Sequence, residues 1–284
     1  MNIKNLIVAL AVSIFVSACA TEKDYLVTIK TEYGDMHAIL YDETPKHKEN
    51  FIKLAKEGFY DSLLFHRVIE DFMIQGGDPD TKKAQPGQQL GSGGPGYQIP
   101  AEFDKDLFHI KGALSAARTN NPEKKSSGSQ FYIVQGKTWT KEELTTDMNK
   151  LGMAARQLMN RGDQDSVKQM LMNIYQTEGP EAYGNKLMEM RSYIEEVMQT
   201  DVTKEMAPER LEAYTTVGGA PHLDDEYTVF GKVIGGLDVI DKIAAQPTDQ
   251  RDRPKNDIRM FVEVEELPKK KISKLYGYEY PEKE

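Results

Sequence analysis

Residues 65–79 read FHRVIEDFMIQGGDP. Apolar residues lie on both sides of an acidic pair, Glu70-Asp71. This pattern predicts two short strands, Leu63–Ile69 and Phe72–Gln75, with the acidic pair in the turn between them. The segment from Pro79 to Pro100 is rich in glycine, proline and glutamine, and this composition is typical of a long ordered loop.

Further strands are predicted on both sides of this hairpin. Alternating apolar residues favour another hairpin at residues 25–41 and four later strands, at Ala113–Ala117, Gln130–Val134, Tyr227–Val233 and Ile258–Leu267. Two helices are predicted as well. Thr44-Pro45 is typical of a helix start and Gly58 of a helix end, and a second helix is expected around Leu237–Ala245. These elements together indicate a β-rich unit with two helices.

The segment from Trp139 to Thr215 has a different character. It shows helical periodicity, no convincing strand and nine of the 13 methionines. It therefore reads as a helical insertion into the β-rich unit, at a loop whose ends lie close together. Two interpretations of the methionines stay open. They form an adaptable apolar surface for unfolded clients or another protein partner, or they fill the core of a small helical bundle.

Three further blocks accompany the opening motif in order: GALSAAR at 112–118, SGSQFYI at 127–133, and Leu223 with VFGKV at 229–233. Together with GSGGPGYQIPAEF at 91–103, they resemble the cyclophilin-type peptidyl-prolyl cis–trans isomerases over about Leu26–Thr138 and Gly218–Leu267. The resemblance implies a mainly β fold, a closed eight-stranded antiparallel barrel capped by two helices. Residues 25–138 and 216–268 would form the barrel, residues 139–215 the α-helical insertion, and residues 269–284 a charged tail.

The resemblance also implies an activity, the acceleration of X–Pro bond rotation in proline-containing unfolded or flexible polypeptides, with no metal and no cofactor. Arg67 would donate hydrogen bonds to the prolyl nitrogen and carbonyl. The other expected site residues bind the substrate: His66, Phe72, Met73, Gln75, Ala117, Arg118, Gln130, Tyr132, His222, Leu223 and Tyr227. Taken singly, Phe72, Met73 and Leu223 are typical of a core, Arg67 of a surface, and His66 of a hydrogen-bonded framework position. Only the joint pattern indicates a site.

Specific roles follow from the same resemblance. The proline pocket would be lined by apolar and aromatic side chains, with Tyr227 at its rim: Phe72, Met73, Tyr132 and Leu223. Gln75 and Gln130 would bind the substrate backbone and steady Arg67, while Ala117 and Arg118 would lie along the peptide and His66 would border the groove. Two departures stand out. His222 lies where many cyclophilins have tryptophan, which bears on inhibitor binding, and Tyr132 and Tyr227 lie where eukaryotic relatives often have phenylalanine and histidine.

The N-terminus reads as an export signal. Lys4 precedes an apolar run, Leu6–Val16, that has the length of a signal-peptide core. The following Val16-Ser17-Ala18-Cys19 resembles a bacterial lipobox. We therefore expect a signal peptide at 1–18, lipidation of Cys19, a linker at 19–24, and attachment to the cell envelope, at the outer membrane. An ordinary signal peptide cut near Ala18 or Ala20 is the alternative.

Several other functions are excluded or disfavoured by composition. The formal net charge of −9 with no long basic face opposes nucleic-acid binding. The five histidines lack metal-ligand spacing, and the single cysteine permits no intramolecular disulfide. Gly91–Gly96 matches G-x-G-x-x-G, but no strand precedes it and prolines follow. Three function classes stay open: an active isomerase, a peptide-binding or chaperone-like module with little turnover, and an envelope lipoprotein whose insertion docks a partner.

Overall fold

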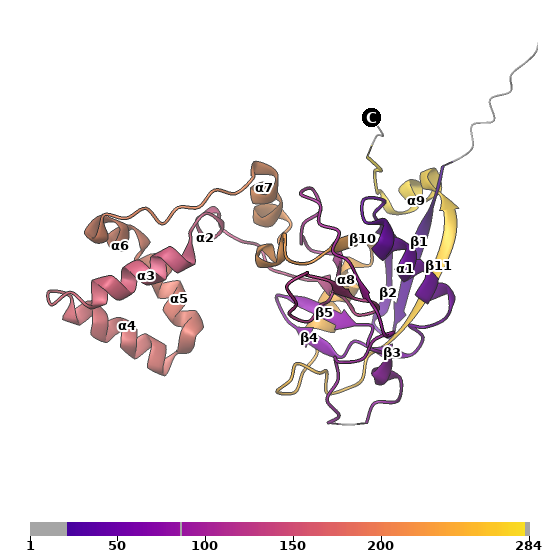
Figure 1. Cartoon of the computed structure of the whole chain (residues 1–284), viewed down its shortest axis with the longest axis horizontal. Coiled ribbons are helices and arrows are strands. Elements are labelled where there is room, and N and C mark those ends of the chain that lie inside the picture. Colours follow the sequence, from indigo (N-terminus) through magenta and orange to yellow (C-terminus); the bar gives the residue numbers. More distant parts are fainter. Residues whose placement is uncertain (1–21, 86, 282–284) are drawn as a thin grey trace, which may run out of the picture.

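The computed structural model describes residues 22–85 and 87–281, and its centre is one strongly curled antiparallel sheet (Figure 1). Nine strands follow one another across it: β3 (Leu63–Leu64), β11 (Arg259–Pro268), β1 (Lys23–Thr31), β2 (Gly34–Leu40), β10 (Val229–Gly235), β7 (Ala113–Ala116), β9 (Phe131–Val134), β5 (Met73–Gly76) and β4 (Arg67–Ile69). A separate pair, β6 (Gln98–Ile99) and β8 (Ser126–Ser127), lies outside this sheet. Two 3-10 turns, Pro79–Lys83 and Pro221–Leu223, complete the loops around it.

The sheet is not the closed eight-stranded barrel that the resemblance implied. The predicted strand Leu63–Ile69 is divided into β3 and β4, which form the two opposite edges of the sheet. Phe65 and His66 connect them. The Phe65 amide donates to the Ile258 carbonyl at 2.9 Å, and the His66 amide donates to the Gln75 carbonyl at 3.0 Å. Each half of the segment is therefore bonded to its own neighbour, so the edges are joined through the chain rather than by a strand ladder.

Both predicted helices form, and both pack against the apolar core of the curled sheet rather than capping the ends of a closed barrel. Helix α1 (Pro45–Lys56) begins after Thr44 with proline in its first turn, and its apolar face buries Phe51 and Leu54. Helix α8 (Leu237–Ala244) buries Val239 and Ile243. These side chains belong to the same apolar core as the inward-facing residues of the strands. Removing this apolar surface from water is the main stabilising contribution to the fold.

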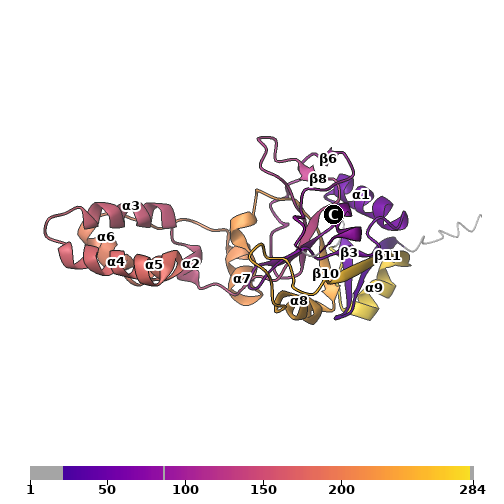
Figure 2. The same cartoon turned by 90° about the horizontal axis from the view of Figure 1, so that it is seen from below.

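The helical insertion forms a body of its own beside the sheet (Figures 1 and 2). We call its four central helices the helical lobe: α3 (Met148–Met159), α4 (Asp165–Thr177), α5 (Gly179–Glu189) and α6 (Arg191–Met198). The lobe has a separate core around Leu151, Leu171 and Ile194. The shorter helices α2 (Lys141–Leu144) and α7 (Pro208–Thr216) lie on the two segments that connect it to the sheet.

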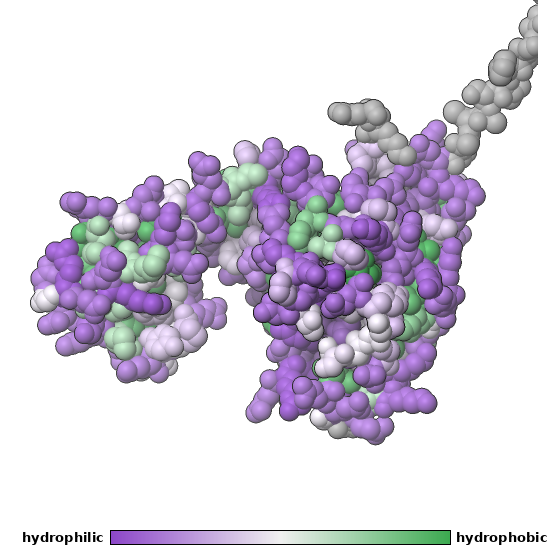
Figure 3. Space-filling model, in the orientation of Figure 1, coloured by the Kyte–Doolittle hydropathy of each residue, from purple (hydrophilic) through white to green (hydrophobic). Residues whose placement is uncertain are grey.

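The nine methionines of the insertion divide between core and surface. Five pack against the core of the lobe: Met159, Met170, Met188, Met190 and Met198. Three are exposed by 41–56%: Met148, Met153 and Met172. Figure 3 shows hydrophobic residues among hydrophilic ones on the visible face of the lobe. The ninth, Met206, is partly buried on the segment that leads out of the lobe. Core filling therefore accounts for five of the nine methionines, and three remain at the surface.

The C-terminal segment, expected to be a charged tail, contains a helix. Helix α9 (Lys269–Tyr276) follows β11 directly and buries Ile272 completely. Ile272 packs in a small core with Leu26, Ile39 and Leu267, and Tyr276, Tyr278 and Tyr280 lie against the same core. Lysines dominate the sequence of this segment, but their spacing leaves one apolar position per turn free to face the sheet.

No helix within residues 22–85 and 87–281 has the length and apolar character needed to cross a bilayer.

The packing of α9 predicts different effects for two substitutions on this helix. Ile272→Ala removes a fully buried side chain, so we expect the free energy of unfolding to fall by about 2–5 kcal/mol. Leu275→Ala is the matched control, because Leu275 is 57% exposed and its loss should change stability by no more than about 0.5 kcal/mol. Urea unfolding followed by circular dichroism measures both. Equal effects would show that α9 does not belong to the folded core.

Candidate functional site

The candidate site is built on a row of side chains that crosses four strands. Arg67 of β4 is paired with Gln75 of β5, Gln75 with Tyr132 of β9, and Tyr132 with Ser115 of β7. Directly opposed residues in antiparallel strands project to the same side of a sheet. The pairing register therefore places a guanidinium, an amide and a phenol side by side on the outer face.

The residues next to these in each strand project to the opposite, inner face of the sheet. Val68, Ile74, Ile133 and Leu114 are paired in the same manner and are at most 1% exposed, because they fill the interior core. A slip of one residue would exchange the two faces. A glycine of the motif at residues 65–79 helps to fix this arrangement. Gly77 has a φ of 89°, and a Cβ there would overlap the carbonyl oxygen of Ser129.

A pocket of about 100 Å³ opens on the outer face, and nine of the twelve expected site residues line it. These are Arg67, Phe72, Met73, Gln75, Ala117, Arg118, Tyr132, Leu223 and Tyr227. Met73, Tyr132 and Leu223 are at least 92% buried and give the pocket apolar walls. The pocket thus combines an apolar interior with a cationic side chain at its edge.

Only the Nε atom of the Arg67 guanidinium has a hydrogen-bond partner among the described residues. Its Nε donates to Asp252 Oδ2 at 3.4 Å, and 42% of the side chain is exposed. Among the described residues, no hydrogen bond uses its two terminal nitrogens. The sequence predicted that Gln75 and Gln130 steady Arg67, but in the structure its hydrogen-bond partner is Asp252. The terminal N–H groups therefore remain available to a bound molecule.

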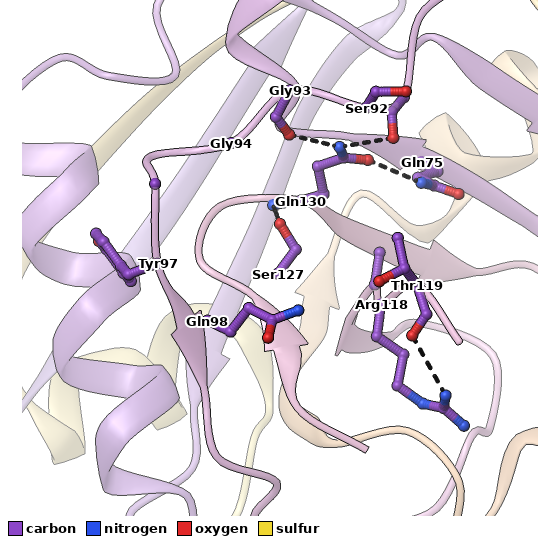
Figure 4. Close-up of a pocket in the computed structure, with 13 residues that line it drawn as sticks. Gln75, Ser92, Gly93, Gly94, Tyr97, Gln98, Arg118, Thr119, Ser127 and Gln130 are labelled. Carbon is purple, nitrogen blue, oxygen red and sulfur yellow. Dashed lines mark hydrogen bonds between the residues drawn. The ribbon is translucent and has the colours of Figure 1, made fainter. Parts of the chain in front are cut away.

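The two glutamines connect the pocket to a wider neighbouring groove of about 420 Å³ (Figure 4). Gln75 Nε2 donates to Gln130 Oε1 at 3.2 Å, and Gln130 Nε2 donates to the carbonyl oxygens of Gly91 and Gly93 at 3.0 and 2.8 Å. Ala117 and Arg118 line both cavities. The two cavities therefore share part of their walls.

Arg118 and Tyr227 together form another part of the pocket wall. Its Nε donates to the Glu226 carbonyl and one terminal nitrogen donates to Glu226 Oε2, both at 3.0 Å. The guanidinium lies 4.6 Å from the centre of the Tyr227 ring, a distance suited to a cation–π contact. The sequence pattern did not predict Glu226, whose pKa is lowered chiefly by its hydrogen bond with Lys124.

The other expected site residues lie beside the pocket rather than in its lining. His66 is 4% exposed and lines a separate cavity beside Arg67, and burial lowers its pKa. The His222 ring lies 5.3 Å from the Phe72 ring, and burial lowers the pKa of His222 as well. The structure therefore brings all twelve expected residues together around one region of the outer face.

One residue in contact with the pocket wall was missed. His109 is fully buried, and its Nε2 lies 3.0 Å from the Tyr132 hydroxyl. A lone histidine between apolar residues carries no sequence signal of its own, so only the fold shows this contact. Among the described residues, no group of three or more His, Cys, Asp or Glu side chains is arranged to hold a metal ion.

Comparison with known proteins decides the family. The model of the family described as "Cyclophilin type peptidyl-prolyl cis-trans isomerase/CLD" matches residues 26–152 and 200–264. The chain belongs to the cyclophilin family. The family match omits residues 153–199, which lie inside the helical insertion. As a cyclophilin, the chain is a peptidyl-prolyl cis–trans isomerase.

Two bacterial relatives agree with this assignment. A Staphylococcus saprophyticus protein named as a peptidyl-prolyl cis–trans isomerase is 33% identical over 80% of this cyclophilin and 85% of its own length. A Streptococcus pyogenes protein named as a bifunctional phosphatase and peptidyl-prolyl cis–trans isomerase is 34% identical over 82% of this chain. This cyclophilin spans only 37% of that longer protein, to which the phosphatase name belongs.

Among solved structures, a cyclophilin-type isomerase of Cryptosporidium parvum, crystallised in the presence of the dipeptide Ala-Pro, aligns with a TM-score of 0.48. The identity is 21%, over 84% of this chain and 96% of that chain.

The buried histidines predict how stability depends on pH. Burial lowers the pKa of His47, His66 and His109 in the folded chain, whereas an unfolded histidine titrates near about 6.5. The unfolded chain therefore takes up more protons as the pH falls below about 6.5, and the free energy of unfolding decreases. We expect a lower value at pH 5.5 than at pH 7.5 in urea unfolding at constant ionic strength.

His66→Gln serves as the comparison, because the amide stays neutral at both pH values. This variant should show a smaller difference in unfolding free energy between the two pH values than the wild-type chain. A wild-type value that is equal at both pH values, or larger at pH 5.5, would contradict the burial of neutral histidines.

Proposed function

We propose that this cyclophilin turns X–Pro bonds in the pocket beside Arg67, with the Arg67 guanidinium as the hydrogen-bond donor to the prolyl nitrogen. The observation that supports this most is the convergence of an apolar pocket and a guanidinium whose outer nitrogens have no partner among the described residues. The substrates would be proline-containing polypeptides in flexible or unfolded form. The pocket suits a small ring rather than a large side chain.

The chemistry explains why these groups suffice. Amide resonance imposes a barrier of about 18–20 kcal/mol on rotation. When the bond is twisted, the prolyl nitrogen becomes pyramidal and gains a lone pair, which can accept a hydrogen bond that the planar ground state cannot. A donor placed at that nitrogen therefore stabilises the transition state selectively. Lowering the barrier by about 7 kcal/mol would accelerate rotation about 10⁵-fold.

Each wall of the pocket has a role in this mechanism. Phe72, Met73 and Leu223 would hold the proline ring and exclude water from the nitrogen. Asp252 would orient Arg67 through Nε and leave the terminal N–H groups directed at the substrate. Arginine suits this role better than lysine, because its planar fork keeps several donors in fixed directions. Gln75 and Gln130, next to the ring, would bind the backbone of the flanking residues.

The assignment of Arg67 predicts a large loss of activity on its removal. Arg67→Ala should lower kcat/KM for an Ala-Pro peptide by about 10²–10³, the usual cost of losing one donor at the reacting centre. The assay follows cis-to-trans isomerisation with the chain from Thr21 to Glu284. Arg156→Ala, which removes an exposed arginine of α3 in the lobe, is the matched control and should leave kcat/KM unchanged.

Two outcomes would count against this mechanism. Arg67→Ala with the activity of the wild-type chain would remove Arg67 from the reacting centre. A folded wild-type chain that binds the peptide without accelerating its isomerisation would favour the alternative of a peptide-binding or chaperone-like module.

We further propose that the protein works on folding polypeptides at the bacterial cell envelope, anchored to the outer membrane by lipid on Cys19. Cys19 and the signal peptide lie outside the described residues, so the proposal rests on the lipobox pattern at 16–19. Strand β1 begins at Lys23, four residues after Cys19. A lipid at Cys19 would therefore hold the sheet close to the membrane surface.

Replacing the cysteine tests the anchor. In a bacterium that processes lipoproteins, the wild-type chain should incorporate radiolabelled palmitate and sediment with the membranes. Cys19→Ser should incorporate none and appear in the soluble fraction. A wild-type chain that is already soluble, or a Cys19→Ser chain that still sediments with membranes, would favour the ordinary signal peptide.

A further inference from the structure

A buried chain of hydrogen bonds leads from the wall of the proline pocket to the end of the helical insertion. The Tyr132 hydroxyl meets His109 Nε2 at 3.0 Å, and His109 Nδ1 meets Asp224 Oδ1 at 2.9 Å. The Tyr214 hydroxyl of α7 lies 2.8 and 2.7 Å from the two oxygens of Asp224. His109 and Tyr214 are fully buried, and the other two side chains are about 95% buried.

The partners fix the direction of each hydrogen bond. The Asp224 carboxylate can only accept, so the proton of the neutral His109 ring lies on Nδ1 and Tyr214 donates its hydroxyl hydrogen. His109 Nε2 is then an acceptor, and Tyr132 donates to it. Burial lowers the pKa of His109 and raises that of Tyr132, so both groups stay neutral near pH 7. The hydrogen bonds from Tyr132 to Tyr214 are therefore satisfied by a single arrangement of protons.

Helix α7 contacts the same segment a second time. Arg210, one turn before Tyr214, donates to both oxygens of Asp225 at 2.9 and 3.1 Å. Asp225 has a φ of 63°, a left-handed conformation that costs a non-glycine residue free energy. This ion pair holds Asp225 in that conformation, between the pocket residues Leu223 and Tyr227. Both bonds from α7 therefore act on the segment that forms one wall of the pocket.

We propose that α7 is a positioning element of the isomerase site, in which Tyr214 sets the placement of Tyr132 and Leu223 through His109 and Asp224. The proposal rests on the proposed function of the pocket. Asp224 is the central group, since it follows Leu223 in the sequence and is linked through His109 to Tyr132, another residue of the pocket wall. Tyr214 completes this bridge from the insertion, and neither Tyr214 nor His109 lines the pocket itself.

The role proposed for α7 does not involve the lobe. The two connecting segments pair where the lobe begins, with the Asp147 amide donating to the Val202 carbonyl at 2.7 Å. Helix α7 comes after this pairing and lies on the side of the sheet. The Trp139 indole donates to the Gly219 carbonyl at 2.9 Å, and the Trp139 amide donates to the Tyr214 carbonyl at 3.1 Å. These bonds join α7 and the segments on either side of the insertion without using any residue of the lobe.

Tyr214→Phe tests the role of α7 with the loss of one oxygen atom. We expect kcat/KM for the Ala-Pro peptide to fall about tenfold, less than the roughly hundredfold cost that a 1 Å misplacement can have. Tyr193→Phe is the matched control. Its hydroxyl also donates within the insertion, to Gln164 at 2.8 Å, but it lies in α6 of the lobe, and activity should stay unchanged.

A double-mutant cycle separates positioning from a purely structural role. If Tyr132 and Tyr214 act through the same bonds, the Tyr132→Phe/Tyr214→Phe double variant should lose about as much kcat/KM as the more affected single variant. Losses that multiply would overturn the proposal. So would a Tyr214→Phe variant with wild-type kcat/KM, whatever its melting temperature.

A second measurement does not depend on turnover. In ¹⁵N-labelled protein, the nitrogen shifts of His109 should report a proton on Nδ1, and Tyr214→Phe should alter those shifts and the methyl signals of Leu223. Unaltered signals would overturn the proposal even in an active enzyme. Altered signals in a chain that fails to turn over the peptide would support the positioning role and count against the proposed function alone.

Discussion

The pairing register of β4, β5, β9 and β7 organises both the core and the site of this protein. Because β4, β5, β9 and β7 pair without slippage, one set of alternate residues fills the interior core and the other forms the site. The inner face of these strands therefore contributes to stability through the core, and the outer face carries the site. A change that shifted the register by one residue would bury Arg67 and expose Ile74, and the cost of burying an unpaired guanidinium makes that state inaccessible.

The two arginines of the site differ in how their guanidinium groups are hydrogen-bonded. Arg67 is fixed through one nitrogen and leaves its outer donors open, whereas Arg118 is tied at several points and supports a wall. This contrast fits a reaction in which no bond is made or broken between heavy atoms, since one directed donor in an apolar pocket is the main requirement. We propose that the buried hydrogen bonds from Tyr132 to Tyr214 hold the walls of this small pocket in place.

Much of the fold could be predicted from local pattern. The hairpin around Glu70-Asp71, helix α1 after Thr44-Pro45, and the convergence of Arg67, Met73 and Leu223 followed from periodicity, turn residues and the family motif. Three features could not. The division of Leu63–Ile69 depends on partners almost 200 residues away, α9 depends on a single buried isoleucine among lysines, and the pairing of His109 with Asp224 joins positions 115 residues apart. Long-range contacts of this kind leave no periodic signal in the sequence.

The central proposal is that an X–Pro bond rotates in the pocket that this register creates. Two-dimensional exchange NMR on an Ala-Pro peptide mixed with isotope-labelled protein tests this directly, because it observes rotation and location together. We expect exchange peaks between the cis and trans peptide far stronger than without protein. The signals of Met73, Tyr132 and Leu223 should shift, and those of Leu151 and Leu187 in the lobe should not. Unaccelerated exchange, or shifts confined to the lobe, would contradict this proposal.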